Sequence, residues 1–175
     1  HWRQERITKV ADEIAAQMGA ERIGTCEIQD TGRPFYGVYY GQAALPHAPE
    51  RLFYLDNAVI RGLKVYNVET QSDIPVYDLG AAAGRDPYEM FLGGARSIIK
   101  ITNPNAAQER RLIVFRDSFG SSIAPLLAAG YSEITLVDIR YISPLSLGKL
   151  IDFTKADDAL FLYSASVINN SETIK

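Results

Sequence analysis

The chain has 175 residues, of which 47% are hydrophobic and 22% charged, so its length and composition are those of one globular domain. A net charge of -3 without a basic cluster argues against nucleic acid or a membrane surface as partner, and no apolar stretch reaches the roughly 20 residues that cross a bilayer. One cysteine and two histidines exclude an internal disulfide framework and give no basis for a zinc site, so we expect neither a metal nor a cofactor.

The first half of the chain is predicted to combine one helix with short strands. Apolar residues repeat at helical spacing from Ile7 to Met18, which predicts an amphipathic helix over residues 3–18. Residues 25–45 are rich in glycine and tyrosine and indicate short strands and loops. The β-like runs AVIRGLKVYNVE and IPVYDLG flank the turn-forming TQSD and can pair as a hairpin. In DPYEMFLGG, Pro87 opens a short helix that the two glycines end.

The second half alternates apolar strands with short helices. The predicted strands are SIIKIT, LIVF, EITLVDI and ALFLYSA, and the helices are SSIAPLLAAG and PLSLGKLIDFTKA. Strands that are apolar on both faces and alternate with helices predict a parallel sheet covered on both sides. We therefore expect an α/β domain over residues 1–175, a three-layer sandwich with a mostly parallel sheet and a β-rich insertion in its first half. LIVF, EITLV and ALFLY should be adjacent parallel strands, crossed by helices at 121–129 and 145–155.

The stretch RDSFG follows the strand LIVF directly and contains a candidate nucleophile, Ser118. Reactive groups in open parallel sheets lie at the carboxyl ends of strands, and the start of a helix offers free N–H groups to an oxyanion. Gly120 permits the close backbone approach that such a turn needs. The alternative is that Ser118 or Asp117 only caps the helix, which suits both residue types. The surroundings do not match the G-x-S-x-G elbow of the α/β-hydrolases.

A serine nucleophile needs a base, and the chain offers two histidines for this role. His47 lies between prolines in LPHAPE, which predicts a loop at the surface. His1 precedes Trp2 and the first predicted helix. His1 is thus either the base or the remnant of a tag.

Several segments together resemble a known family. His1-Trp2 matches the second half of an Asp-His-His-Trp motif that precedes a helix, and residues 117–120 match a downstream Asp-Ser-Phe-Gly. DPYEMFLGG, ITNPN and LVDIRY add to the likeness, which covers nearly the whole chain. In these motifs the chain resembles the DHHW-type proteins, a branch of the SGNH-hydrolase-like superfamily that is similar to the alginate O-acetylation proteins.

The resemblance implies a circularly permuted SGNH arrangement in which Ser118 is the nucleophile and His1 is the base. It also implies that a carboxylate two residues before His1 orients the imidazole. We therefore expect the domain to have an upstream N-terminal part that these 175 residues do not include.

The resemblance further implies that the oxyanion is held by the Ser118 amide, a glycine amide and an asparagine side chain. The candidates for the second and third donors are Gly94 and Asn103, with Gly93 and Asn105 as alternatives. Each of these four also has a structural explanation, as a helix stop or as part of an Asn-Pro-Asn turn. Three residues are expected to line the substrate pocket: Arg140, Tyr141 and Tyr88. Arg140 can bind an anionic sugar there or simply pair with Asp138.

The resemblance favours a serine esterase or O-acetyltransferase that acts on acetyl groups of a cell-surface or secreted bacterial polysaccharide. The expected partner is an acetylated glycan or another small ester, met outside the cytoplasm. A second hypothesis is a catalytically inactive glycan-binding module in which the tyrosines of FYGVYY stack on sugars, although aromatic residues in strands usually pack in the core. The third is a capped helix and a tag histidine without a shared site.

Overall fold

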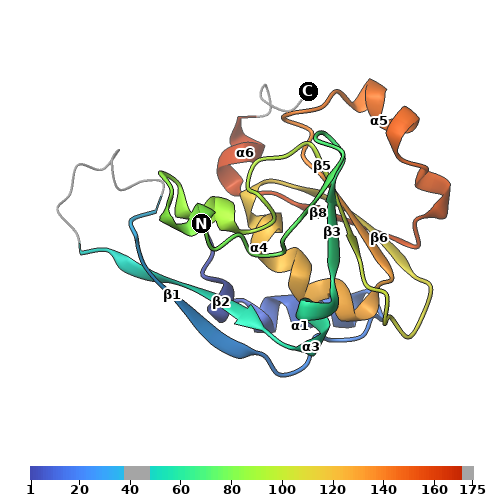
Figure 1. Ribbon diagram of the computed structural model, residues 1–175. Helices are drawn as coiled ribbons and strands as arrows, with labels where there is room; N and C mark the ends of the chain where they lie inside the picture. The colour runs from blue at the N-terminus through green and yellow to red at the C-terminus, as the bar shows by residue number, and fades with distance from the viewer. Residues whose placement is uncertain (38–47, 171–175) are drawn as a thin grey trace.

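The computed structural model describes residues 1–37 and 48–170, and its main element is a six-stranded sheet with the order β4-β3-β5-β7-β6-β8 (Figure 1). A separate two-stranded ribbon of β1 (Glu27–Phe35) and β2 (Glu50–Asp56) extends away from this sheet. The strands of the main sheet are β3 (Lys64–Asn67), β4 (Ser72–Ile74), β5 (Ile98–Thr102), β6 (Arg111–Arg116), β7 (Glu133–Val137) and β8 (Asp158–Leu162).

The expected three-layer sandwich with a mostly parallel sheet is wrong, because the sheet is mixed. β6 pairs in parallel with both β7 and β8, so the predicted adjacency of LIVF, EITLV and ALFLY is confirmed. The pairings of β3 with β4, of β3 with β5 and of β5 with β7 are all antiparallel. With the β1–β2 ribbon included, four of the six pairings of the described strands are antiparallel.

The length of the connections explains why strand direction was mispredicted. Residues 103–110 link β5 to β6 without a helix, so the chain reverses and β5 runs against β7. The parallel strands are instead linked through α4 (Ser118–Leu127) and α5 (Pro144–Leu150), since a parallel connection needs a crossover. β5 is buried on both faces in either arrangement, and its apolar sequence therefore does not reveal its direction.

Two helices cover one face of the sheet. α1 (Thr8–Gln17) and α4 pack together there. The main core joins Ile7 and the helix residues Ala11, Ile123, Leu126 and Leu127 to the sheet residues Val65, Ile99, Ile101, Leu112, Val114, Ile134 and Leu136. On the other face the covering helix is the short α5, where Leu147 and Ile151 pack on three sheet residues, Ile98, Ile113 and Val137. Burial of each large aliphatic side chain stabilises the fold by about 1.5–3 kcal/mol, so the position of α4 is fixed mainly by its apolar face.

The predicted helix of the first half is present, whereas the predicted hairpin is shifted. The span 3–18 contains η1 (Gln4–Arg6) and α1. β3 does pair with β4, but Ser72 and Asp73 of β4 belong to the predicted turn TQSD, and only Ile74 belongs to the predicted strand IPVYDLG. The start of AVIRGLKVYNVE is not a strand but α3 (Ala58–Gly62), because the side chain of Asn57 accepts a hydrogen bond from the Ile60 amide and caps a helix.

The remaining elements are single turns and a short helix at the end of the described chain. They are η2 (Ala81–Ala83), η3 (Pro87–Met90), η4 (Ala128–Gly130), η5 (Phe153–Lys155) and α6 (Ala165–Asn169). The side chain of Asp86 caps η3, as the DPYEMFLGG pattern predicts, and Gly93 and Gly94 follow with φ of 70° and 75°. Within the described ranges, no helix is both long and apolar enough to cross a membrane.

Gln4 fixes the start of the chain to the rest of the domain. Its side chain is buried and donates to the Ser122 carbonyl at 2.7 Å, and it accepts from the Leu55 amide at 2.7 Å. Gln4→Ala is expected to lower the free energy of unfolding by about 2–3 kcal/mol, since the buried Leu55 amide loses its acceptor. Urea denaturation measures the change. Gln17→Ala, at an exposed position of α1, is the control and should leave the midpoint unchanged.

Candidate functional site

The turn between β6 and α4 shows which of its residues caps the helix, a role that the sequence allowed for either Ser118 or Asp117. Asp117 is the N-cap: one carboxylate oxygen accepts from the Phe119 amide at 2.9 Å and the other from the Ser164 amide at 2.7 Å. Ser118 is the first residue of α4, and its hydroxyl forms no hydrogen bond with the described residues. Capping is therefore done by Asp117, and the Ser118 hydroxyl is left for other chemistry.

His1 lies beside this turn because two pairs of stacked rings hold the start of the chain there. Its imidazole stacks on the Tyr88 ring with centroids 4.0 Å apart, and Trp2 stacks on Phe119 at 4.6 Å. The Tyr88 hydroxyl also donates to the Trp2 carbonyl at 3.0 Å. The Nε2 atom of His1 is buried and has no hydrogen-bond partner in the described part of the chain.

His1 and Ser118, at the two ends of the predicted motif pair, line the same cavity of about 420 Å³. The cavity lies at the edge of the sheet where β6 and β8 end and β5 begins. Its walls come from the η3 region, from α4, from the segment after β7 and from α6: His1, Asp86, Tyr88, Glu89, Gly94, Ala95, Arg116, Ser118, Phe119, Ser121, Arg140, Tyr141, Ser164, Ser166 and Val167.

The structure brings some of the predicted oxyanion residues to this cavity and not others. Gly94 is in the wall, but its amide already donates to the Phe91 carbonyl at 3.1 Å. Asn103 follows the carboxyl end of β5, which lies at the opposite edge because β5 is antiparallel to β7. There its side chain donates to the Ala128 carbonyl and accepts from the Asn105 amide, so it has a structural role. The prediction of Asn103 as an oxyanion donor is not supported.

Arg140 pairs with Asp138 and also reaches the cavity wall. Its Nε and Nη2 atoms donate to the two carboxylate oxygens at 2.9 and 2.7 Å, and this bonding raises the pKa of the guanidinium. The Arg140 guanidinium lies 5.4 Å from the ring centre of Tyr141, which is 52% exposed.

Tyr163 lies near the same carboxylate. Burial together with the nearby Asp138 raises the pKa of Tyr163 to about 12, so its hydroxyl stays protonated at neutral pH.

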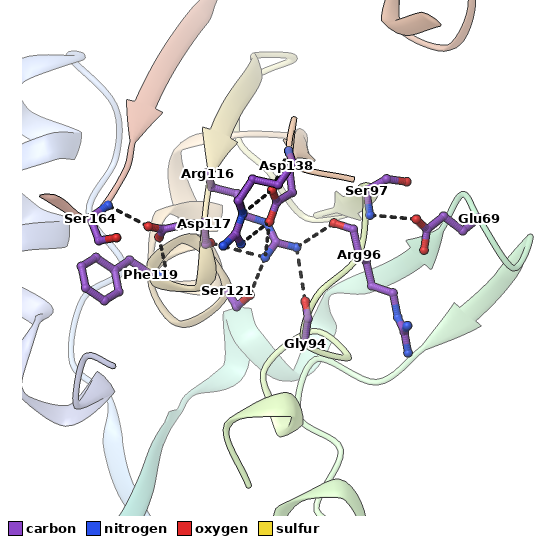
Figure 2. A network of polar contacts seen from close by, with 11 residues as sticks. Glu69, Gly94, Arg96, Ser97, Arg116, Asp117, Phe119, Ser121, Asp138 and Ser164 are labelled. Carbon is purple, nitrogen blue, oxygen red and sulfur yellow. Dashed lines mark hydrogen bonds and ion pairs between the residues drawn. The ribbon is translucent and has the colours of Figure 1, made fainter. Parts of the chain in front are cut away.

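Arg116 is the buried charge under the site. It is 1% exposed, and desolvation lowers the pKa of its guanidinium although Asp138, 3.9 Å away, opposes the shift. Figure 2 shows it between the first turn of α4 and the loop that carries Gly94 and Arg96. A side chain as polar as arginine at the end of a central strand was the available sequence signal for this position.

Two serines of the cavity wall were not predicted from the sequence, and some predicted residues lie outside the described ranges. Ser164 and Ser166 follow β8, whose carboxyl end meets the same sheet edge as that of β6, so like Ser118 they lie at the strand ends where ligands of parallel sheets bind. His47 and the last tyrosines of FYGVYY are outside the described residues. Among residues 1–37 and 48–170, no three His, Cys, Asp or Glu side chains gather as a metal site would require.

Among known proteins, this chain is similar to solved structures that share its fold. No family model and no curated protein matches the sequence. Solved structures do match: a DHHW family protein from Eubacterium siraeum has a TM-score of 0.72 and 22% identity over 99% of this chain. Bacillus cereus PatB1, solved with a sulfonyl adduct, has a TM-score of 0.73 and 21% identity over 96% of this chain, and a second PatB1 structure gives 0.68 and 20%. The fold is therefore similar to that of a DHHW family protein and of PatB1. The chain spans 60% and 59% of the first two.

Proposed function

We propose that the chain carries the nucleophile and the base of a serine esterase or O-acetyltransferase that acts on acetyl groups of a bacterial cell-surface or secreted polysaccharide. The observation that carries the proposal is the shared cavity. Ser118, whose hydroxyl does not cap α4, lines it together with His1, whose Nε2 atom has no hydrogen-bond partner within residues 1–37 and 48–170. Such a pairing of serine and imidazole is what acyl transfer requires. Because a cell-surface or secreted polysaccharide lies outside the cytoplasm, the proposal includes an extracytoplasmic location.

In the proposed reaction, the Ser118 oxygen attacks the acetyl carbonyl carbon while His1 Nε2 takes the hydroxyl proton. The Ser118 amide is at the first position of α4 and has no acceptor within the helix, so it can donate to the oxyanion at the positive end of the helix dipole. His1 then returns the proton to the leaving sugar oxygen. Water or a second sugar hydroxyl, activated by His1, removes the acetyl group from Ser118.

The neutral imidazole needs a fixed orientation for this role. The stack on Tyr88 fixes the plane of the His1 ring, and the proposed carboxylate two residues before His1 would bond Nδ1 and hold Nε2 toward the serine. The sugar itself would lie toward the open side of the cavity, where the exposed ring of Tyr141 offers a stacking face.

The sulfonyl adduct recorded for PatB1 supports the proposal through its chemistry, because a sulfonyl group becomes attached to a protein by attack of a nucleophilic side chain. At 21% identity the likeness concerns the fold, so the nucleophile of this chain needs its own test.

Covalent labelling with phenylmethylsulfonyl fluoride tests the proposal directly. We expect the reagent to modify Ser118, which tandem mass spectrometry would locate within the tryptic peptide of residues 117–140. Ser118→Ala should lose the label. Ser166→Ala removes another hydroxyl of the same cavity and should keep it. Equal labelling of the parent and Ser118→Ala would refute Ser118 as the nucleophile.

A further inference from the structure

Arg116 joins the serine turn to a second loop of the cavity. Its Nη1 atom donates to the Ser121 hydroxyl at 3.0 Å and to the Asp117 carbonyl at 3.4 Å, both in the turn that begins α4. Its Nη2 atom donates to the carbonyls of Gly94 and Arg96 at 3.4 and 3.3 Å. One buried guanidinium thus fixes the loop between η3 and β5 relative to Ser118 (Figure 2).

The hydrogen bond to the Gly94 carbonyl determines where the next amide points. In a planar trans peptide the C=O and N–H groups point in opposite directions. Since the Gly94 carbonyl faces the buried Arg116, the Ala95 N–H faces away from it, and Ala95 lines the cavity with Ser118. The Ala95 N–H has no hydrogen-bond partner among the described residues, whereas the amide of Ser97 is bonded to Glu69.

We propose that the Ala95 N–H is the second oxyanion donor and that Arg116 is the positioning residue that aims it. This inference rests on the proposed acyl-transfer function. It assigns to the Ala95 amide the role for which the sequence suggested Gly94 and Asn103, one of which has a bonded amide while the other lies at the opposite sheet edge. Two backbone amides, of Ser118 and Ala95, then hold the developing negative charge from two sides of the cavity.

Gly120 is the residue that lets Arg116 adopt this position. A Cβ atom at Gly120 would lie 2.4 Å from Cβ and 2.7 Å from Cγ of Arg116, closer than such atoms approach. The stem of the arginine is therefore folded against the first turn of α4, and Gly120→Ala would displace it without changing its charge.

Three changes test the proposal in the protein that shows Ser118-dependent deacetylation. Replacing Ala95 by lactic acid, its α-hydroxy analogue, removes the N–H and should lower kcat by about 10²-fold. Arg116→Lys keeps the charge but loses the paired donors, and Gly120→Ala displaces the arginine. Each of these two single variants should lower kcat by at least about 10-fold. KM should stay within about twofold in all three, because a donor that acts on the oxyanion binds the transition state more than the ground state.

Ser146→Ala is the control, since it removes an exposed serine hydroxyl on α5 that neither lines the cavity nor bonds Arg116, so kcat should stay at the parental value. Circular dichroism and melting curves establish which variants are folded, and the lactic acid variant leaves Arg116 intact should Arg116→Lys not fold. A parental kcat in the folded lactic acid variant would overturn the inference while Ser118→Ala remains inactive. Unchanged activity in Ser118→Ala would instead overturn the proposed function.

Discussion

Ser118→Ala is expected to lower the rate of acetate release from an acetylated glycan by at least about 10³-fold, because removal of the nucleophile disables a catalytic group that works as a unit. The Ser118 hydroxyl makes no hydrogen bond with the described residues, so its loss should leave the melting temperature unchanged. Enzymatic quantification of free acetate measures the rate, and p-nitrophenyl acetate reports background ester reactivity beside it.

The same assay tests the proposed carboxylate upstream of His1. The carboxylate of a triad fixes the tautomer of the histidine and stabilises the imidazolium. A chain that includes the residues before His1 should therefore be faster than residues 1–175 by about 10²-fold or more, and Ser118→Ala should abolish that gain. Equal rates of Ser118→Ala and the parent in the longer chain, with glycan binding retained, would favour the glycan-binding module over the enzyme.

Asp138→Ala is expected to lower the free energy of unfolding by about 3–5 kcal/mol, because it leaves a buried guanidinium without its carboxylate. Asp138 is fully buried and lies 3.9 Å from Arg116, which is 1% exposed and so does not reach water to recover the loss. Arg140 is partly exposed and can turn its side chain toward solvent. Urea denaturation followed by circular dichroism measures the change.

An exposed ion pair provides the comparison for this stability prediction. Glu50 lies 3.7 Å from Arg3, with about half of its side chain in solvent, and an exposed pair contributes about 0–1 kcal/mol. Glu50→Ala should accordingly shift the urea midpoint far less than Asp138→Ala. Similar shifts in the two variants would show that Arg116 does not depend on Asp138.

The sequence was informative about fold where the chain has local signals. Helical spacing located α1, and the apolar runs located β6, β7 and β8 in their parallel arrangement. The direction of β5 was not predictable from its own residues, since IIKIT is buried in the same way whichever way it runs. The absence of a helix in residues 103–110 was the usable signal, because a parallel link to β6 needs a crossover.

The candidate site shows a similar division between local and long-range information. The turn after β6 and the motif before α1 were recognisable, and the structure places Ser118 and His1 in one cavity. Asn103 was selected for its residue type, but the direction of β5 carries it to the opposite edge. The residue type of Ala95 does not indicate that its backbone N–H is free to donate, since the orientation of that N–H depends on which carbonyls Arg116 binds.

The antiparallel direction of β5 also bears on how such a protein can diversify. It is the start of β5, rather than its end, that meets the ends of β6 and β8 at the cavity. The segment from β4 to β5 therefore forms much of the cavity rim without taking part in the strand crossovers that hold Ser118. Within it, Tyr88 stacks on His1 and Ala95 lies beside the serine turn, so changes of length that spare both are confined to the part ahead of η3, residues 79–85. Insertions there can reshape the entrance while the groups around Ser118 keep their positions.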